Sequence, residues 1–439
     1  MTHIGLGELV RRVRRDGVGG VSRRVIYELY HRSGASSLGR AIADADLVGA
    51  SALDLPTLDG PAPADAKVGW VMAAPAAGSG GHTTLFRMIA GLRERGLSSV
   101  IFLYDARGGD LERHARVIRE HWPWLDAEIR DARAGITGVA AAVASSWESA
   151  HVLAKYGTAP MARLYFVQDF EPFFHPRGST YALAENTYRF GFRIIALGRM
   201  VHSLLLERGV ASDLVPFGRD AQSYRFENRG DRSGVLFYVR RQNERRGYSL
   251  GTLALEEFHR RHPEQTIHTF GDTVSNWTVP VIDHGNLDPS QLNDLYNRVL
   301  GGLALSFTNV SLVPEEMLAA GAIPVVNDDP YARVELRHSH VVWAAPDPSA
   351  LAEALCTVVE APDARRRAAA AAGEEESASV SWSTVQDAVF AIISDELRGP
   401  VSRGAGAAIS EVVGIGSSPV PPLQAAPTDD DHPLRERPT

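Results

Sequence analysis

Residues 306–328, SFTNVSLVPEEMLAAGAIPVVND, decide the fold. The apolar runs Gly302–Phe307 and Ile323–Val326 each predict a buried strand. Between them, Glu315–Ala320 predicts a short helix that Gly321 ends. A strand, a helix and a second strand in this order predict a βαβ unit of a parallel sheet.

The start of this helix is a candidate site for an anion. Pro314 stands at its first turn, where unpaired backbone N–H groups and a partial positive charge suit a diphosphate. Glu316, one turn further, can accept hydrogen bonds from the two vicinal hydroxyls of a ribose. The alternative is a purely structural βαβ turn.

The segment resembles the nucleotide-sugar site of family-4 glycosyltransferases of the GT-B fold. Their motif has two glutamates eight positions apart, and the second opens a segment like E-A-M-A-x-G followed by x-P-V-V. Glu316 matches the second glutamate, but Thr308 stands where the first, a ligand of sugar hydroxyls, is expected. The resemblance implies a donor site that also includes Ser311, Leu312 and Val313.

Composition sets broad limits. The 439 residues predict two or three domains, and 44% hydrophobic with 22% charged residues is typical of a globular protein. The formal charge of −8 argues against nucleic acid as the main partner. The single cysteine, Cys356, excludes an internal disulfide and fits a reducing cytosol. No apolar run is long enough for a membrane span, so we expect a cytoplasmic protein.

The two ends of the chain differ in composition from the residues between them. Residues 1–64 are predicted as a basic helical extension and a linker. A helix from Ser22 places apolar residues on one face with arginines beside it, so it either lies peripherally on an anionic membrane at its inner face or packs on the main body. Residues 399–439, rich in Pro, Gly, Ser and Asp, are predicted to be disordered.

The first globular domain is predicted over residues 65–211. A strand at Val68–Met72, a glycine-rich loop and a helix opening at His82 begin a doubly wound α/β domain. By resemblance, Gly80 and Gly81 of this loop face the nucleotide sugar; the alternative is that a tight βα turn needs glycine anyway. The resemblance also implies that a last helix, 382–398, completes this domain.

The sequence QDFEPFF follows a predicted strand in this domain, at Arg163–Val167. Ligand-contacting groups of open α/β sheets cluster beyond the carboxyl ends of strands. The segment looks like its equivalent in WsaF-type rhamnosyltransferases, a branch of family 4, which implies catalytic roles for Gln168 and Asp169. The alternative is a hydrophobic staple on a loop.

The second domain is predicted over residues 212–381, after a turn similar to the family's P-x-G-x-D. Its first strand, Gly234–Val239, is followed by four arginines where the family carries two cations for the diphosphate. Either Arg240 or Arg241 fills the first role, and either Arg245 or Arg246 fills the second. Among them, Arg241 and Arg246 are predicted to stabilise the leaving group during catalysis. A solvated charge cluster is the alternative.

Two further segments are assigned to the nucleoside. Gly271 ends a predicted strand, and Asn286 and Leu287 match the family's G-x-L segment before the helix that shapes the base pocket.

These observations predict an α/β protein with two Rossmann-like doubly wound domains facing a cleft, resembling GT-B enzymes. By resemblance the enzyme retains anomeric configuration without a metal ion or other cofactor. The donor is expected to be dTDP-rhamnose, with UDP- and GDP-sugars as alternatives. The acceptor is expected to be a cell-surface glycan or lipid-linked glycan. A GT-B epimerase and an inactive nucleotide-binding subunit are the competing functions.

Overall fold

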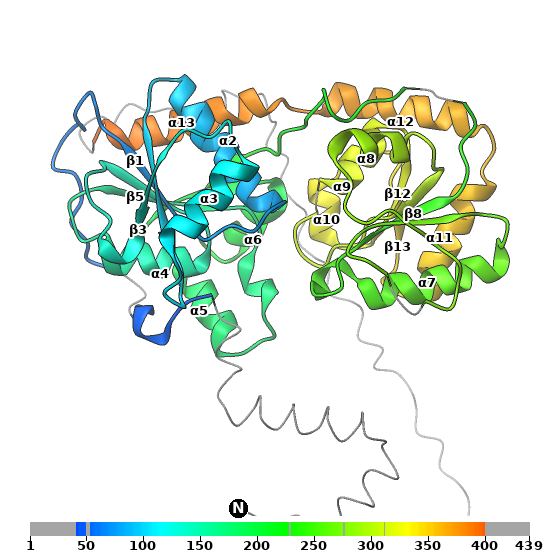
Figure 1. Cartoon of the computed structure of the whole chain (residues 1–439), viewed down its shortest axis with the longest axis horizontal. Coiled ribbons are helices and arrows are strands. Elements are labelled where there is room, and N and C mark those ends of the chain that lie inside the picture. The colour runs from blue at the N-terminus through cyan, green and yellow to red at the C-terminus, as the bar shows by residue number, and fades with distance from the viewer. Residues whose placement is uncertain (1–40, 50–52, 228–229, 275–276, 311, 400–439) are drawn as a thin grey trace, which may run out of the picture. The chain divides into compact units, whose positions relative to one another are not determined.

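The computed structural model describes residues 41–49, 53–227, 230–274, 277–310 and 312–399. They form two parallel sheets with helices packed against them, which confirms the predicted fold class (Figure 1). The predicted membrane-contacting helix and residues 400–439 of the predicted tail lie outside the described residues.

The first sheet has seven strands in the order β3-β2-β1-β4-β5-β6-β7, all paired in parallel. Its strands are β1 (Val68–Ala73), β2 (Ser99–Tyr104), β3 (Glu128–Asp131), β4 (Ala141–Ala144), β5 (Ala162–Val167), β6 (Arg193–Leu197) and β7 (Asp213–Val215). The helices between them are α2 (Gly80–Glu94), α3 (Leu111–His121), α4 (Trp147–Tyr156), α5 (Ser179–Thr187) and α6 (Arg199–Glu207). Short 3₁₀ turns are η2 (Asp44–Asp46), η3 (Ala132–Ala134) and η4 (Glu171–Phe174).

The second sheet repeats this order with six strands, β10-β9-β8-β11-β12-β13. Its strands are β8 (Val235–Val239), β9 (Ile267–Gly271), β10 (Ile282–Asp283), β11 (Gly301–Leu303), β12 (Ile323–Asn327) and β13 (Val342–Ala344). The helical elements are η5 (Glu244–Arg246), α7 (Tyr248–Arg261), α8 (Pro289–Tyr296), α9 (Val313–Ala319), α10 (Pro330–Glu335), α11 (Pro348–Glu360), α12 (Ala364–Ala378) and α13 (Trp382–Leu397).

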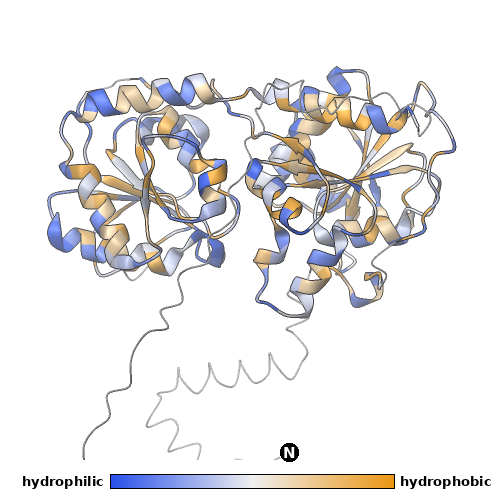
Figure 2. Ribbon diagram, turned by 180° about the vertical axis from the view of Figure 1, so that it is seen from behind, coloured by the Kyte–Doolittle hydropathy of each residue, from blue (hydrophilic) through white to orange (hydrophobic). Residues whose placement is uncertain are grey.

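Apolar residues concentrate in the strands and on the helix sides that face them (Figure 2). This distribution follows from the parallel topology, because crossover helices cover both faces of each sheet. β11 contains two glycines that the close packing of its neighbouring strands requires. A Cβ atom at Gly301 or Gly302 would lie 2.2 Å from a carbonyl oxygen of β12 or β8, so only glycine allows these strands to pair.

The boundaries of β11 and α2 differ from the sequence prediction. β11 ends at Leu303 rather than Phe307, because the chain leaves the ladder and Asn327 binds the backbone of Ser306 at both its N–H and its C=O, each at 2.8 Å. The helix expected from His82 begins at Gly80, since the Ser79 side chain accepts a hydrogen bond from the His82 N–H and caps it. Gly80 and Gly81 therefore lie in the first turn of α2 and not in the loop.

The last helix, α13, packs against α2. The Gln386 side chain donates to the Arg87 carbonyl at 2.9 Å, and Arg95 forms an ion pair with Asp387 at 2.7 Å. Arg193 at the start of β6 binds Asp395 near the end of α13 at 2.7 Å. These contacts attach the end of the described chain to the layer that covers the first sheet.

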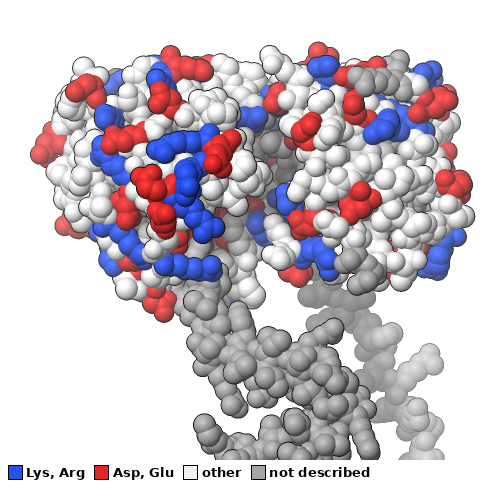
Figure 3. Space-filling model, in the orientation of Figure 1, with Lys and Arg blue, Asp and Glu red and all other residues white. Residues whose placement is uncertain are grey.

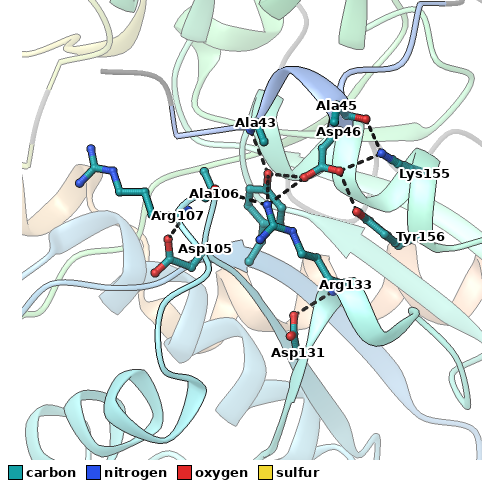
Figure 4. Close-up of polar contacts among 11 residues, drawn as sticks. Ala43, Ala45, Asp46, Asp105, Ala106, Arg107, Asp131, Arg133, Lys155 and Tyr156 are labelled. Carbon is teal, nitrogen blue, oxygen red and sulfur yellow. Dashed lines mark hydrogen bonds and ion pairs between the residues drawn. The ribbon is translucent and has the colours of Figure 1, made fainter. Parts of the chain in front are cut away.

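The segment before β1, predicted as a linker, is hydrogen-bonded to residues at the start of β5 and in the neighbouring helices. Pro56 O accepts hydrogen bonds from Met161 N and from the Arg163 guanidinium, the latter at 2.7 Å. Asp46, only 3% exposed, binds four side chains (Figure 4). They are Tyr104 at 2.6 Å, Tyr156 at 2.7 Å, Lys155 at 2.8 Å and Arg133 at 3.1 Å.

The surface carries both signs of charge. On the face shown in Figure 3, lysine and arginine side chains are intermixed with aspartate and glutamate. Within the described ranges, no helix combines the length and the apolar composition needed to cross a membrane.

Candidate functional site

The strand order of the second sheet reverses between β8 and β11. Chains that leave the carboxyl ends of two such strands diverge, and open α/β sheets bind ligands at this switch point. The loop after β8 carries Arg240, Arg241, Arg245 and Arg246, and the loop after β11 carries residues 304–312. The topology therefore brings the predicted cations to the ligand-binding edge.

Gly247 fixes how the arginine loop enters α7. Its φ of +63° is left-handed, and a Cβ atom there would lie 2.9 Å from Leu305 of the neighbouring loop. Glycine is favoured on both grounds, by conformation and by space. This turn places Arg245 and Arg246 immediately beside the β11 loop.

Arg246 is enclosed by neutral oxygen acceptors. Its Nη1 donates to Ser306 Oγ at 2.7 Å and to the Asn309 carbonyl at 3.4 Å. Burial lowers the pKa of the Arg246 guanidinium, and the favourable charge that acts on it most strongly is Asp169. That carboxylate is already ion-paired with Arg245, so two cations share one anion.

Asp169 lies at the end of β5 and contacts the second sheet's loops. It accepts hydrogen bonds from Arg245 Nη1 at 3.1 Å, Thr308 Oγ1 at 2.8 Å and the Asn309 N–H at 3.0 Å. Arg245 also stacks on the Phe174 ring, with its guanidinium carbon 3.6 Å from the centroid. The structure therefore pairs Asp169, from the first predicted domain, with Arg245, from the second.

Gln168 joins the same group through its backbone. Its carbonyl accepts a hydrogen bond from Asn309 Nδ2 at 2.8 Å. A Cβ atom at Gly81 would contact the Gln168 side chain at 3.7 Å, so the start of α2 reaches this group too. Sequence reasoning missed Ser306 and Asn309, although polar residues directly after a buried strand are the signal that singled out Gln168 and Asp169.

Glu171, the second carboxylate of the QDFEPFF segment, faces the core instead. It accepts hydrogen bonds from the Trp147 N–H, at the start of α4, and from the Tyr165 hydroxyl at 2.9 Å. Burial, followed by the charge of Glu148, raises the pKa of Glu171 well above its ordinary value. Of the two carboxylates at this edge, only Asp169 reaches the arginine loop.

The other two arginines are associated with Asp272, beyond β9. Its carboxylate accepts hydrogen bonds from Arg240 Nη1 at 3.3 Å and from the Arg241 backbone N–H at 2.9 Å. The Arg241 guanidinium lies over the Tyr248 ring, 5.6 Å from its centroid. Gly271 has φ +101° and leaves room for the Val239 carbonyl, which a Cβ atom would approach to 2.4 Å.

Glu316 belongs to a second group, on α9. Tyr296 donates a hydrogen bond to its carboxylate at 3.3 Å. Burial raises the pKa of Glu316 to about 7, and the charge of Asp220 acts in the same direction. A carboxylate that is half protonated at neutral pH is able to gain strong hydrogen bonds from hydroxyl donors on becoming charged.

The anion site expected at the start of α9 is weaker than predicted. The helix has seven residues, Pro314 removes one N–H donor, and two glutamates occupy the first turn. A short helix with acidic residues at its N-terminus offers little positive potential. Positive charge at this edge therefore comes from the arginines.

The remaining predicted site residues lie in two segments, around the start of α9 and before α8. Leu312 precedes α9 and Val313 begins it, whereas Ser311 lies outside the described residues. Asn286 is exposed, and Leu287 packs on the core of the second sheet. The Gly271 N–H donates to the Gly285 carbonyl at 2.8 Å, which brings both segments assigned to the nucleoside together.

Comparisons with known proteins give a consistent picture. Residues 136–199 match a model of the N-terminal domain of WsaF, and residues 233–356 match a model of its C-terminal domain. The O-antigen biosynthesis protein RfbC of Myxococcus xanthus is 32% identical over 295 residues, which is 62% of this chain. The chain spans only 22% of the length of that relative.

Solved structures share the fold at low sequence identity. Anabaena Alr3699/HepE in complex with UDP-glucose has a TM-score of 0.58 and 14% identity, covering 75% of this chain and 99% of that one. A glycosyltransferase from Rickettsia africae has a TM-score of 0.53 and 12% identity, covering 76% of this chain and 100% of that one. WaaG, a glycosyltransferase involved in lipopolysaccharide biosynthesis, has a TM-score of 0.53 and 12% identity, covering 74% of this chain and 99% of that one.

Proposed function

We propose that this chain, a WsaF-like glycosyltransferase of the GT-B fold, moves a sugar from a nucleoside diphosphate donor to a glycan or lipid-linked glycan of a surface polysaccharide. The donor class is supported by the complex of Anabaena HepE with UDP-glucose. The acceptor class is supported by the O-antigen relative.

The surplus positive charge at Arg246 carries this proposal. Arg245 and Arg246 share Asp169, and Arg246 itself is bonded only to Ser306 and Asn309 oxygens among the described contacts. Excess positive charge that is partly desolvated favours a bound anion, since attraction is stronger where water is excluded. A diphosphate supplies that anion.

The reaction follows from this arrangement. As the bond between the sugar and the diphosphate breaks, negative charge grows on the departing phosphate oxygen. Arg246, with Arg241 as the second cation, stabilises that charge, which lowers the barrier of the step in which it develops. Glu316 holds the ribose hydroxyls, so the diphosphate is fixed with respect to the arginines.

We assign Asp169 a positioning role near the place where the acceptor is expected to bind. Through Thr308 and Asn309 it fixes the β11 loop, which also supplies the acceptors that orient Arg246. Asp169 also pairs with Arg245 of the loop after β8. Gln168 holds the same loop through Asn309. We propose that losing the Asp169 charge slows transfer more than it weakens nucleotide binding.

The best candidate for the sugar is rhamnose, delivered from dTDP-rhamnose with retention of configuration, by similarity to WsaF. UDP- and GDP-sugars are the alternatives. Thr308 replaces the carboxylate of the related motif, and its hydroxyl is bonded to Asp169, so this position does not select among the donors.

A panel of dTDP-, UDP- and GDP-sugars, assayed by mass spectrometry with lipid-linked acceptors, tests the proposal. Transfer from one donor class is expected, whereas epimerised donor without transfer, or binding without turnover, would assign one of the competing functions. We expect transfer to persist in EDTA because arginines provide the positive charge. A strict requirement for Mg²⁺ or Mn²⁺ would refute that mechanism.

The cellular setting is a further part of the proposal. We place the enzyme in the cytoplasm, as the single cysteine suggests, with residues 1–40 contacting an anionic membrane surface. Deleting residues 1–40 is expected to abolish sedimentation with anionic liposomes and to leave nucleotide affinity unchanged.

A further inference from the structure

A group of metal-capable side chains lies apart from the arginine loop. His338 and His340 stand in the segment between α10 and β13, and Glu374 is on α12. Among the described residues these three place one ligand atom each within 4.8 Å of the others. None of them contributes to the proposed transfer reaction.

The Nδ1 atom of His338 lies close to the other two ligand atoms of this group. The residue is 8% exposed, and its Nε2 lies 3.1 Å from the Ala371 carbonyl oxygen. A carbonyl only accepts, so Nε2 carries the hydrogen. Nδ1 is then an acceptor nitrogen, and it accepts a hydrogen bond from the His340 backbone N–H at 3.2 Å.

The Glu374 carboxylate lies beside His338 and His340. The Ser339 hydroxyl and the Ser339 N–H, the latter at 2.7 Å, bind it and lower the pKa of Glu374 to about 2. His340 Nδ1 approaches its other oxygen at 3.2 Å. Glu374 Oε1 and His338 Nδ1 lie 3.7 Å apart, so a carboxylate oxygen and an imidazole nitrogen are close enough to share a bound ion.

The spacing of the His338 and Glu374 ligand atoms is close to the spacing that a shared metal ion imposes. In a tetrahedral site with bonds of about 2.0–2.1 Å, ligand atoms lie roughly 3.3–3.4 Å apart. The observed 3.7 Å is a few tenths of an ångström longer.

We propose that His338, His340 and Glu374 bind a zinc-type divalent cation through two imidazole nitrogens and one carboxylate oxygen, with water completing the coordination. Two imidazoles and a carboxylate suit Zn²⁺ better than Mg²⁺, which prefers oxygen ligands. To bind, His340 moves its ring proton from Nδ1 to Nε2, so the cation replaces the present hydrogen bond to Glu374.

Neighbouring groups already hold two of these side chains in place, as outer-shell groups do around a metal ion. The Ala371 carbonyl fixes the tautomer of His338, and Ser339 holds Glu374. Such partners orient metal ligands and raise affinity. The bound cation ties the 338–340 loop to α12, and α12 packs on α9, which carries Glu316. The site is therefore structural, and it stands independently of the transfer reaction.

Calorimetric titration of the tag-free, chelator-treated full chain with ZnCl₂ tests this assignment. One equivalent of Zn²⁺ is expected to bind and to raise the melting temperature, whereas Mg²⁺ is expected to do neither. His340→Asn and Glu374→Gln should each weaken Zn²⁺ binding by about tenfold or more, the range already seen for outer-shell changes. Both side chains are partly exposed, so both variants are expected to fold.

His262→Ala is the matched control. His262 contacts Glu264 at 3.1 Å and Glu360 at 3.0 Å, so it also combines an imidazole with carboxylates. This variant should bind Zn²⁺ like the parent. The proposal is overturned if the parent binds no Zn²⁺, if both ligand variants bind it undiminished, or if only His262→Ala loses it. A Co²⁺ absorption spectrum typical of four ligands, lost in Glu374→Gln, would support it.

Discussion

Asp46 and Arg246 are both charged residues enclosed by protein, but their partners differ. Asp46 receives hydrogen bonds from two tyrosines and contacts two cations, Lys155 and Arg133 (Figure 4). Arg246 contacts a serine hydroxyl and a backbone carbonyl, and the carboxylate that acts on it most strongly, Asp169, is already paired with Arg245.

Under the proposed function, the difference separates a charge that holds the fold from a charge that binds a ligand. A buried ion with full compensation contributes to stability, and removing one partner is costly. A buried cation with incomplete compensation lowers stability and is retained where a bound anion completes its partners. The first region attaches the N-terminal segment, and the second lies at the ligand-binding edge of its sheet.

Arg246→Ala is the strongest test of this comparison. Truncating one member of a desolvated charged pair costs about 2–5 kcal/mol, so affinity for UDP or dTDP should fall about a hundredfold. Calorimetry with the diphosphate and with the nucleoside gives the measurement, and the nucleoside should be affected much less. Arg245→Ala is the matched control and should lose less, because Arg245 is already paired with Asp169. Equal losses in the two variants would contradict the distinction.

Asp46→Asn tests the other region of the comparison, the contacts around Asp46. The change leaves Lys155 and Arg133 without their carboxylate, but each cation is about one-third exposed, so we expect a loss of about 2 kcal/mol in the free energy of unfolding. Urea denaturation gives the value, and nucleotide affinity of the folded protein should not change. Asp54→Asn, at an exposed position, is the control for charge alone.

The contacts of Asp46 also predict how stability depends on pH. Burial opposes ionisation of Asp46, but the bonds from Lys155 and the tyrosines outweigh it and hold its pKa far below the ordinary value of 3.8. The stabilisation is therefore present above about pH 4 and is lost as the pH falls. Asp46→Asn should flatten the acid side of the stability curve, and an unchanged curve would argue against the anchor.

Glu316→Gln tests the ribose assignment. Gln is still able to accept a hydrogen bond from Tyr296, so the fold should persist while the charge is lost. Losing a charge-assisted bond costs about 1.5 kcal/mol, or roughly tenfold in affinity. UDP and UMP should weaken alike, since both carry the ribose. A loss confined to UDP would move Glu316 to the diphosphate.

Much of the fold was predictable from the sequence, because alternating buried strands and helices leave few topologies open. Proline and glycine around Glu315–Ala320 indicated α9, and Asp288 with Gln291 indicated the start of α8. The end of β11 was not predictable. Ala304 and Leu305 are buried as strand residues are, and only the contact of Ser306 with Asn327, from another strand, ends the ladder.

The sequence predicted where the residues of the candidate site lie along the chain, but it did not predict which residues they contact. Four arginines after β8 indicated a cationic loop, yet the sequence left open which of them face a ligand. Their partners, Asp169 and Asp272, lie far away in the sequence, so the pairing depends on tertiary structure. The Asp46 anchor gave no signal at all, because Asp46 stands among alanines and its partners come from three other elements.

The pH dependence of nucleotide binding is the smallest and most specific effect. Burial raises the pKa of Glu316 from its ordinary 4.5 to about 7, so in the free protein its contribution to stability is present below about pH 4.5 and is lost as the pH rises through 7. Binding has the opposite sign, because ribose hydroxyls donate to the charged form. Between pH 7 and pH 8 the charged fraction rises from about one half to about nine tenths, and affinity for UMP should rise about twofold. Other titrating groups, including the phosphate, act equally in Glu316→Gln, so the difference between the two proteins isolates this carboxylate. The same twofold rise in Glu316→Gln would show that the dependence arises elsewhere, and that Glu316 does not hold the ribose as a carboxylate.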